Sequence, residues 1–236
     1  MHTEYHKWFS PRLGRDMQMK IYGHDGLPVI VFPTSCGSYV EFEDRGMVEE
    51  LAWKIDGGQI QLYCVDSVDE ESWYNRNVGP RWRIARHMQY EDYVMNEVLP
   101  LVRQKNHNPK LAAMGCSFGG YHAANIALRH PDIFTAFLSM GGAFDPSNFL
   151  RGYYDSDCYF YLPTHYIPQM TDPWYLDRYR QNTYVMATGV EDMCWKDNEE
   201  MARIMRDKGI PVKLDVWGDH TGHDWPWWRK MVQVYL

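Results

Sequence analysis

The fold of this chain is decided by the stretch Leu111-Ala112-Ala113-Met114-Gly115-Cys116-Ser117-Phe118-Gly119-Gly120. Its first half, 111–115, is short and apolar, as expected of a buried parallel strand. The residues that follow, 121–130, carry small and apolar side chains at helical spacing, and Pro131 ends that helix. A strand, a G-x-S-x-G turn and a helix in this order predict a nucleophile elbow at Ser117. The competing interpretation is a glycine-rich turn with an incidental serine.

Ser117 needs partners to react, because a serine hydroxyl is a weak nucleophile at neutral pH. The partners are a histidine base and an acid that orients it. On sheets of this kind the acid comes first along the chain and follows a late strand. The strand expected at 183–188 is followed by Glu191 and Asp192. We predict Asp192 as the acid, with Glu191 as the second candidate.

Two histidines, His220 and His223, follow the last expected strand. We predict His223 as the base, because Gly222 before it allows a bend and the terminal helix begins close behind it. His220 is the alternative. Together with Asp219 and Asp224 the two histidines form no recognised metal-ligand motif. We therefore expect neither a metal nor another cofactor.

An oxyanion hole takes two backbone N–H groups. The first is expected from Phe118, the residue after the nucleophile, and the second from the loop after an early strand. Pro33 begins that loop and has no N–H to donate. The second donor is therefore one of the next three residues, which are Thr34, Ser35 and Cys36. We predict Ser35, and we expect the other two to line the substrate site.

Short apolar runs alternate with amphipathic stretches, which is typical of an α/β fold with a mostly parallel sheet and helices on both faces. We predict a single domain over residues 1–236 with seven or eight strands. The expected strands are 17–22 (antiparallel, at the edge), 28–32, 59–65, 111–115, 136–140, 183–188 and 212–217. The expected helices, besides 121–130, are 46–55, 90–104, 198–208 and 225–235.

One long interruption, 143–182, is rich in Tyr, Asp and Pro and has weak periodicity. An insertion of this length is usually a lid or a binding loop. We expect its aromatic side chains, Tyr154 among them, to contact the substrate; the alternative is a surface loop with small helices. In the loop after 59–65, Trp73 is predicted to line the pocket, with a capped turn as the alternative.

Composition narrows the class of protein. The net charge of −7 and the pI of about 5.8 argue against nucleic-acid binding, because no basic stripe is available to neutralise phosphates. No run approaches the roughly 18 apolar residues of a membrane span, and no signal peptide is recognised. The 5 cysteines are scattered without a C-x-x-C pair. A cytoplasmic protein with a small-molecule partner is expected, and a homo-oligomer is left open.

At these residues the chain resembles the α/β-hydrolase superfamily, and within it the esterase branch that includes S-formylglutathione hydrolase (esterase D) and the mycolyltransferase antigens. The matching motifs are Gly115 to Tyr121, Arg129-His130-Pro131-Asp132-Ile133-Phe134, Gly189 to Asp192, and Gly222-His223-Asp224-Trp225 with Trp228. The chain departs from many members at Pro33-Thr34, where they have His-Gly. The resemblance implies an α/β-hydrolase fold and a cofactor-free serine esterase that acts through an acyl-enzyme on carboxylic or thioester bonds.

Two other functions fit the same residues. An acyltransferase uses the same triad with another alcohol or amine in place of water. A non-catalytic member of the fold would serve binding or assembly, although this chain keeps a serine, an acid and a histidine in the expected order.

Overall fold

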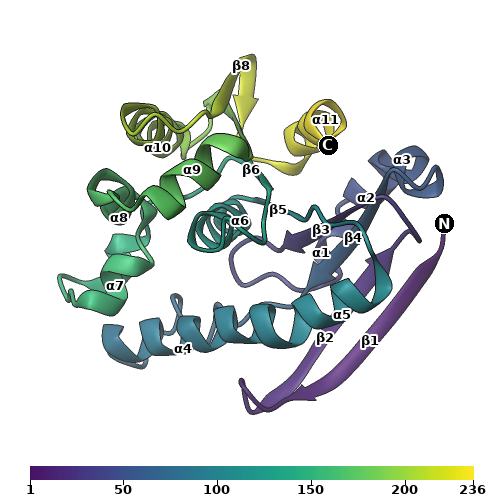
Figure 1. Ribbon diagram of the computed structural model, residues 1–236, viewed down its shortest axis with the longest axis horizontal. Helices are drawn as coiled ribbons and strands as arrows, with labels where there is room; N and C mark the ends of the chain where they lie inside the picture. The colour runs from purple at the N-terminus through teal and green to yellow at the C-terminus, as the bar shows by residue number, and fades with distance from the viewer.

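A mostly parallel sheet forms the centre of the molecule (Figure 1). The computed structural model describes all 236 residues. The strands are β1 (Thr3–Ser10), β2 (Arg15–Tyr22), β3 (Leu27–Phe32), β4 (Ile60–Val65), β5 (Ala112–Cys116), β6 (Ala136–Met140), β7 (Thr183–Glu191) and β8 (Lys213–Gly222). They lie in the order β1-β2-β4-β3-β5-β6-β7-β8. Only the pairings of β1 with β2 and of β2 with β4 are antiparallel. The predicted α/β class and its parallel sheet are confirmed.

All seven predicted strands are present, and β1 is an eighth that the sequence pattern did not indicate. The strand predicted at 17–22 is antiparallel as expected, but β1 lies outside it and takes the edge position. The side chains of β1 that turn toward the protein are mostly polar. They are Glu4, His6, Trp8 and Ser10. Without alternating apolar residues, the usual signal of a half-buried strand is missing.

Helices cover both faces of the sheet, as predicted (Figure 1). One face carries α1 (Glu41–Asp44), α2 (Met47–Glu50), α3 (Ala52–Asp56) and α11 (Trp225–Tyr235). The other face carries α4 (Pro80–Tyr93), the π-helical turn η1 (Val94–Val98), α5 (Leu99–Lys105), α6 (Phe118–Arg129) and α10 (Trp195–Asp207). Each layer of helices packs on the sheet through its own buried hydrophobic cluster.

Two predicted helices differ from the observed ones in their extent. The helix predicted at 46–55 is divided at Leu51 into α2 and α3. The helix predicted at 90–104 begins earlier, because Pro80 occupies the first turn of α4, where its missing N–H costs nothing. Pro100 is accommodated near the start of α5, directly after the π-helical turn.

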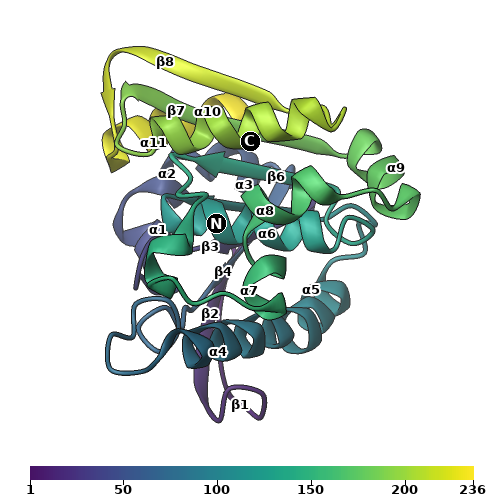
Figure 2. The ribbon, with the colours of Figure 1, turned by 90° about the vertical axis from the view of Figure 1, so that its left-hand side faces the viewer.

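The insertion 143–182 folds into short helices. They are η2 (Pro146–Leu150, a 3-10 helix), α7 (Ser156–Phe160), α8 (Pro163–Gln169) and α9 (Pro173–Gln181). Three of the four begin at a proline, and aspartates at 145, 155 and 172 cap three of them through side-chain acceptors. Figure 2 shows α7 and α8 between α4 and α10.

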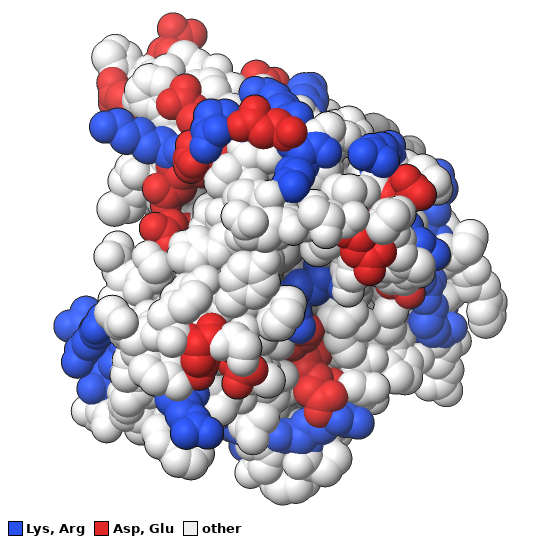
Figure 3. Space-filling model, turned by 60° about the vertical axis from the view of Figure 1, so that its left-hand side comes forward, with Lys and Arg blue, Asp and Glu red and all other residues white.

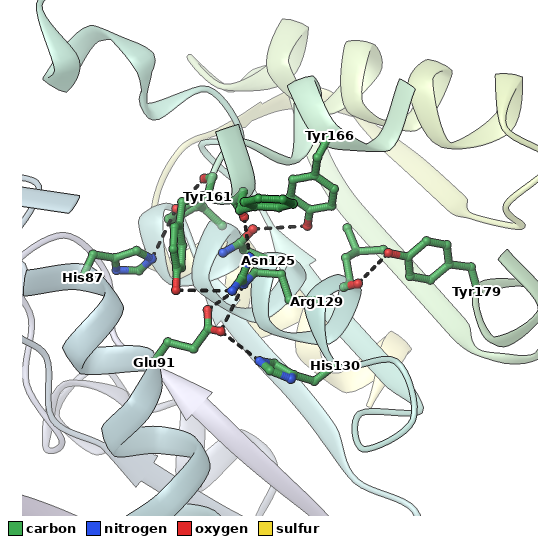
Figure 4. A network of polar contacts seen from close by, with 11 residues as sticks. His87, Glu91, Asn125, Arg129, His130, Tyr161, Tyr166 and Tyr179 are labelled. Atoms are coloured by element: carbon green, nitrogen blue, oxygen red, sulfur yellow. Dashed lines mark hydrogen bonds and ion pairs between the residues drawn. The ribbon is translucent and has the colours of Figure 1, made fainter. Parts of the chain in front are cut away.

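A polar network joins this insertion to the core (Figure 4). Glu91 of α4 is 10% exposed and accepts hydrogen bonds from Nε of Arg129 and from Nε2 of His130, each at 2.9 Å. The Arg129 guanidinium lies over the ring of Tyr161 and donates to the carbonyl oxygen of Phe160 at 2.9 Å. The network therefore connects α4, the end of α6 and α7.

The helices are all too short or too polar to cross a lipid bilayer. On the face in Figure 3, acidic and basic side chains are interspersed, with an uncharged area between them.

The Glu91 network predicts a loss of stability in acid. Burial raises the pKa of Glu91, but His130 and Arg129 outweigh it, so the pKa falls from 4.5 to about 2. Because the folded-state pKa is depressed, this stability is present above about pH 4.5 and is lost as the pH falls toward 2. Glu91→Gln should lower the free energy of unfolding at pH 7 by roughly 3 kcal/mol, since it leaves Arg129 without its anion. Urea unfolding at pH 7 and pH 3 measures both effects.

The matched control is Glu200→Gln, because Glu200 pairs with Arg203 on the exposed side of α10. That pair is solvated and should contribute little. Equal stability losses in the two variants would contradict the role given to Glu91.

Candidate active site

Ser117 stands on the turn between β5 and α6 in a strained backbone conformation, with φ 54° and ψ −123°. The close approach of α6 to the sheet leaves no room for side chains beside it. A Cβ on Gly119 would lie 2.4 Å from the carbonyl oxygen of Phe32, and one on Gly115 would lie 2.3 Å from the carbonyl carbon of Gly119. The two glycines therefore allow the sharp turn that lifts the Ser117 hydroxyl away from the sheet.

The three side chains predicted as a triad are brought together in the structure. Nε2 of His223 lies 2.9 Å from Oγ of Ser117, and Nδ1 of His223 lies 2.7 Å from Oδ1 of Asp192. The Asp192 side chain is 1% exposed and that of His223 is 17% exposed. In this arrangement an imidazole can take a proton from the hydroxyl while a buried carboxylate stabilises the charge that forms.

The second candidates, Glu191 and His220, lie outside this chain of hydrogen bonds. They contact each other, and the His220 side chain is 87% exposed. Strand β8 continues to Gly222, five residues beyond the predicted end at 217, so His220 belongs to the strand extension. The acid that contacts His223 is Asp192. A hydrogen bond of 2.7 Å from the N–H of Cys194 to Oδ1 of Asp192 holds its carboxylate in place.

Gly141, after β6, makes room for the contact between acid and base. Its φ is +59°, and a Cβ there would lie 2.6 Å from Oδ2 of Asp192, 3.1 Å from Nδ1 of His223 and 3.2 Å from Nε1 of Trp228. The Trp228 ring meets the imidazole edge-on, with centroids 4.9 Å apart. Any side chain at position 141 would therefore push into the imidazole and into the two groups that orient it, Asp192 and Trp228.

The loop after β3 leaves one free backbone donor among the three that we considered. The N–H of Thr34 donates to Oε2 of Glu41 at 2.7 Å, and the N–H of Cys36 donates to Oδ2 of Asp69 at 3.3 Å. The N–H of Ser35 makes no hydrogen bond within the protein. Phe118 is the first residue of α6, so its N–H has no acceptor within the helix.

The residues predicted to bind substrate are distributed differently from expectation. Trp73 is fully buried and packs edge-on against the rings of Phe118 and Tyr121, so it does not line an open pocket. Its neighbour Tyr74 is only partly buried, and its ring lies 4.6 Å from that of Phe149. We call Tyr74 and Phe149 the aromatic wall. The Tyr74 hydroxyl contacts Oγ of Ser35 at 2.6 Å, which places this wall beside the loop after β3.

Three further predicted residues have other surroundings. Tyr154 is 52% exposed, and its hydroxyl contacts Nδ1 of His165 within the insertion at 2.9 Å. Cys36 is an exposed residue. Partial desolvation of its thiol, together with the nearby charges of Asp69 and Glu70, raises the pKa of that thiol to about 11. Thr34 is partly buried, with its hydroxyl bound to Glu41 at 2.7 Å.

One group of side chains has the spacing of a metal site, namely Asp192, Cys194 and His223, with ligand atoms within 4.8 Å of one another. Two of the three are the acid and base just described. Burial and the nearby Asp192 and Asp197 raise the pKa of the Cys194 thiol to about 12.

Sequence reasoning did not identify Glu41, Asp69, His122 or Phe149, which shape the loop and the wall. Glu41 and Asp69 are ordinary loop and helix-end acids by pattern, and only the folding of the chain brings each to a backbone N–H near Ser35. The one signal available was position: His122 lies five residues after the serine, on the same helix.

Gly141→Ala should reduce kcat/KM roughly a hundredfold, because a displacement of about 1 Å in a catalytic group costs on that order. The added methyl would force Asp192 and His223 apart. Gly209→Ala is the matched control, since Gly209 has a similar φ of +69° but open space around its Cβ position. Steady-state kinetics on a p-nitrophenyl ester tests the pair, and equal activity in both variants would contradict the packing argument.

Comparisons with known proteins agree with this fold. A model of the putative esterase family matches residues 10–236. No curated protein sequence matches the chain.

Similar solved structures include a ferulic acid esterase, with a TM-score of 0.78 and 18% identity over 100% of this chain and 96% of that one. An S-formylglutathione hydrolase from Agrobacterium tumefaciens has a TM-score of 0.75 and 15% identity over 99% and 92% of the chains. MPT51 from Mycobacterium tuberculosis has a TM-score of 0.65 and 17% identity over 98% and 96%. These likenesses establish the fold. Because the family model covers nearly the whole chain, the protein belongs to the putative esterase family and is a carboxylic ester hydrolase with the α/β-hydrolase fold.

Proposed function

We propose that this esterase cleaves its substrate through a triad of Ser117, His223 and Asp192. The observation that carries the proposal is the continuous chain of two hydrogen bonds from the serine hydroxyl through the imidazole to the buried carboxylate, at 2.9 and 2.7 Å. The strained backbone at Ser117 supports it, because strain of this kind is held at functional sites. The exposed pair of Glu191 and His220 has no such chain.

The reaction proceeds in two steps, formation of an acyl-enzyme and its hydrolysis. Oγ of Ser117 attacks the ester carbonyl carbon while its proton passes to Nε2 of His223, and the N–H groups of Phe118 and Ser35 stabilise the oxyanion that forms. His223 then gives the proton to the departing alcohol, which leaves an acyl-enzyme. A water molecule, deprotonated by His223, attacks the acyl carbonyl, and the proton finally returns to Ser117 as the acid leaves. Asp192 holds the imidazole and stabilises its positive charge.

The acyl group is proposed to lie against the aromatic wall of Tyr74 and Phe149. The wall is partly exposed, and the contact of Tyr74 with Ser35 connects it to the loop after β3. Flat or apolar acyl groups fit such a surface, because aromatic rings offer large contact area and favourable stacking. The ferulic acid esterase among the similar structures is named for a substrate with an aromatic acid. Only the beginning of the insertion is assigned to substrate binding by this proposal.

Ser117→Ala should abolish hydrolysis of p-nitrophenyl acetate, with a loss in turnover of roughly a millionfold. Ser156→Ala is the control, because Ser156 is exposed at the start of α7. The two variants should have the same melting temperature as the wild type, so that loss of activity cannot be ascribed to unfolding. Equal rates in Ser117→Ala and the wild type would refute the assignment of the nucleophile.

Phe149→Ala should reduce kcat/KM for methyl ferulate and p-nitrophenyl octanoate roughly tenfold and leave the acetate ester nearly unchanged, because a hydrophobic contact with the acyl group discriminates by about that factor. Phe160→Ala is the control, an aromatic residue of the insertion that is 51% exposed. A uniform decrease for all three esters would remove the aromatic wall from the substrate site.

A further inference from the structure

A buried carboxylate–imidazole pair, Asp69 and His122, lies beneath the proposed oxyanion hole and takes no part in the chemistry described above. The side chains of Asp69 and His122 are 1% and 3% exposed, and Nε2 of His122 lies 3.0 Å from Oδ1 of Asp69. A carboxylate at this depth is costly unless its oxygens have partners. The other oxygen, Oδ2, accepts the N–H of Cys36 at 3.3 Å. Asp69 therefore divides its two oxygens between helix α6 and the loop after β3.

The loop after β3 needs contacts from other parts of the chain to keep its conformation, because its backbone is strained at Cys36. Cys36 has φ +56°, in the left-handed region that residues with a Cβ seldom adopt. The turn is closed by a hydrogen bond of 2.9 Å from the N–H of Gly37 to the carbonyl oxygen of Thr34. Such a conformation persists only when its surroundings impose it. The Asp69 carboxylate accepts a hydrogen bond from the N–H of Cys36, the strained residue itself.

Carboxylates bind the N–H groups on both sides of Ser35. Oε2 of Glu41 accepts from Thr34, and Oδ2 of Asp69 accepts from Cys36. The N–H of Ser35 alone is left free. Fixing both neighbouring peptide groups fixes the direction of the Ser35 N–H, which is what a preorganised donor requires.

His122 connects this loop to the other half of the hole. It lies on α6, the helix that begins with Phe118 and follows Ser117 directly. Its ring stacks on Phe32, with centroids 5.8 Å apart, and meets the ring of Phe118 edge-on at 4.9 Å. The imidazole is therefore held rigidly by packing, and so is the carboxylate that it contacts.

We propose that Asp69 and His122 are positioning residues that set the distance between the loop carrying the Ser35 N–H and the helix carrying the Phe118 N–H. The proposal rests on the function proposed above, since it gives those two N–H groups a common oxyanion. Without the pair, the turn at Cys36 relaxes and the Ser35 N–H turns away from the developing charge. The effect appears in the transition state and not in the binding of the ester.

The test uses two substitutions of His122 and one of Asp69 in the full-length protein. His122→Phe keeps a ring for packing but removes the hydrogen-bond donor, whereas His122→Gln restores an N–H donor without the ring. Asp69→Asn removes the charge at almost constant shape. His130→Asn is the matched control, because His130 also contacts a buried carboxylate, that of Glu91, at the far end of the same helix.

We measure kcat and KM with p-nitrophenyl acetate, the melting temperature, and the affinity for a trifluoromethyl ketone. The Ser117 hydroxyl adds to the carbonyl carbon of this inhibitor, the proton passes to His223, and the ketone oxygen becomes an anion in the hole. The inhibitor therefore reports the oxyanion interaction without turnover.

His122→Phe and Asp69→Asn should lower kcat roughly tenfold to a hundredfold, less than the loss of about 10²–10³ for deleting an oxyanion donor outright. The inhibitor affinity should fall by the same factor, with KM within about twofold of the wild type. His122→Gln should recover most of kcat. His130→Asn should lower the melting temperature without changing kcat.

A purely structural role predicts a different result, in which the variants lose thermal stability and kcat stays at the wild-type value. That outcome in either His122→Phe or Asp69→Asn would overturn the proposal, so one folded variant is sufficient. If Ser117→Ala is inactive while these variants keep full activity, the positioning role fails and the triad stands. If Ser117→Ala keeps activity, the proposed function itself has failed.

Discussion

The close approach of helix α6 to the sheet is the constraint on which the rest of this structure depends. Gly115 and Gly119 allow backbone to meet backbone at distances where no Cβ fits, and β3 lies on the other side of the same contact. This packing imposes the strained turn at Ser117. It also places the first N–H of α6, that of Phe118, directly beside the serine. It also determines where every partner must lie, because β7 and β8 follow from β5 by parallel pairing and deliver their loops to one edge of the sheet.

Buried and partly buried carboxylates hold the loops at that edge. Asp192 orients the imidazole, and Glu41 and Asp69 bind backbone N–H groups on either side of Ser35. At the opposite end of α6, Glu91 connects the helix to the insertion in the same way. Loops cannot be fixed by the regular ladders of a sheet or a helix, so their backbone groups need other partners. A charged acceptor is the stronger choice, because its hydrogen bonds are about twice as strong as neutral ones. Each carboxylate in turn needs a donor in the core to remain buried.

The insertion has two separate parts with different surroundings. Its beginning reaches the site, where Phe149 packs on Tyr74 and the N–H of Ala143 donates to the carbonyl oxygen of Ser117. Its later helices, α8 and α9, lie along the far part of α6, where the hydroxyl of Tyr179 donates to the carbonyl oxygen of Leu128. Since α6 rises about 1.5 Å per residue, these helices are remote from the serine at its other end. Aromatic content alone does not distinguish the two parts.

The sequence by itself determined the elements whose signals are local. The elbow at Ser117, the parallel strands and the order of acid and histidine follow from apolar runs, glycines and spacing, all of which act within a few residues. Strand β1 was missed because its inward residues are mostly polar. Trp73 was misplaced because a position in the loop after a strand does not distinguish a side chain in the pocket from one in the core beneath it. Only the tertiary structure decided that Asp69 meets both Cys36 and His122, and that Glu41 takes the N–H of Thr34. Those contacts join residues from different loops and helices. The residues come close only when the whole sheet and its helices have assembled, so no local pattern of residues encodes the contacts.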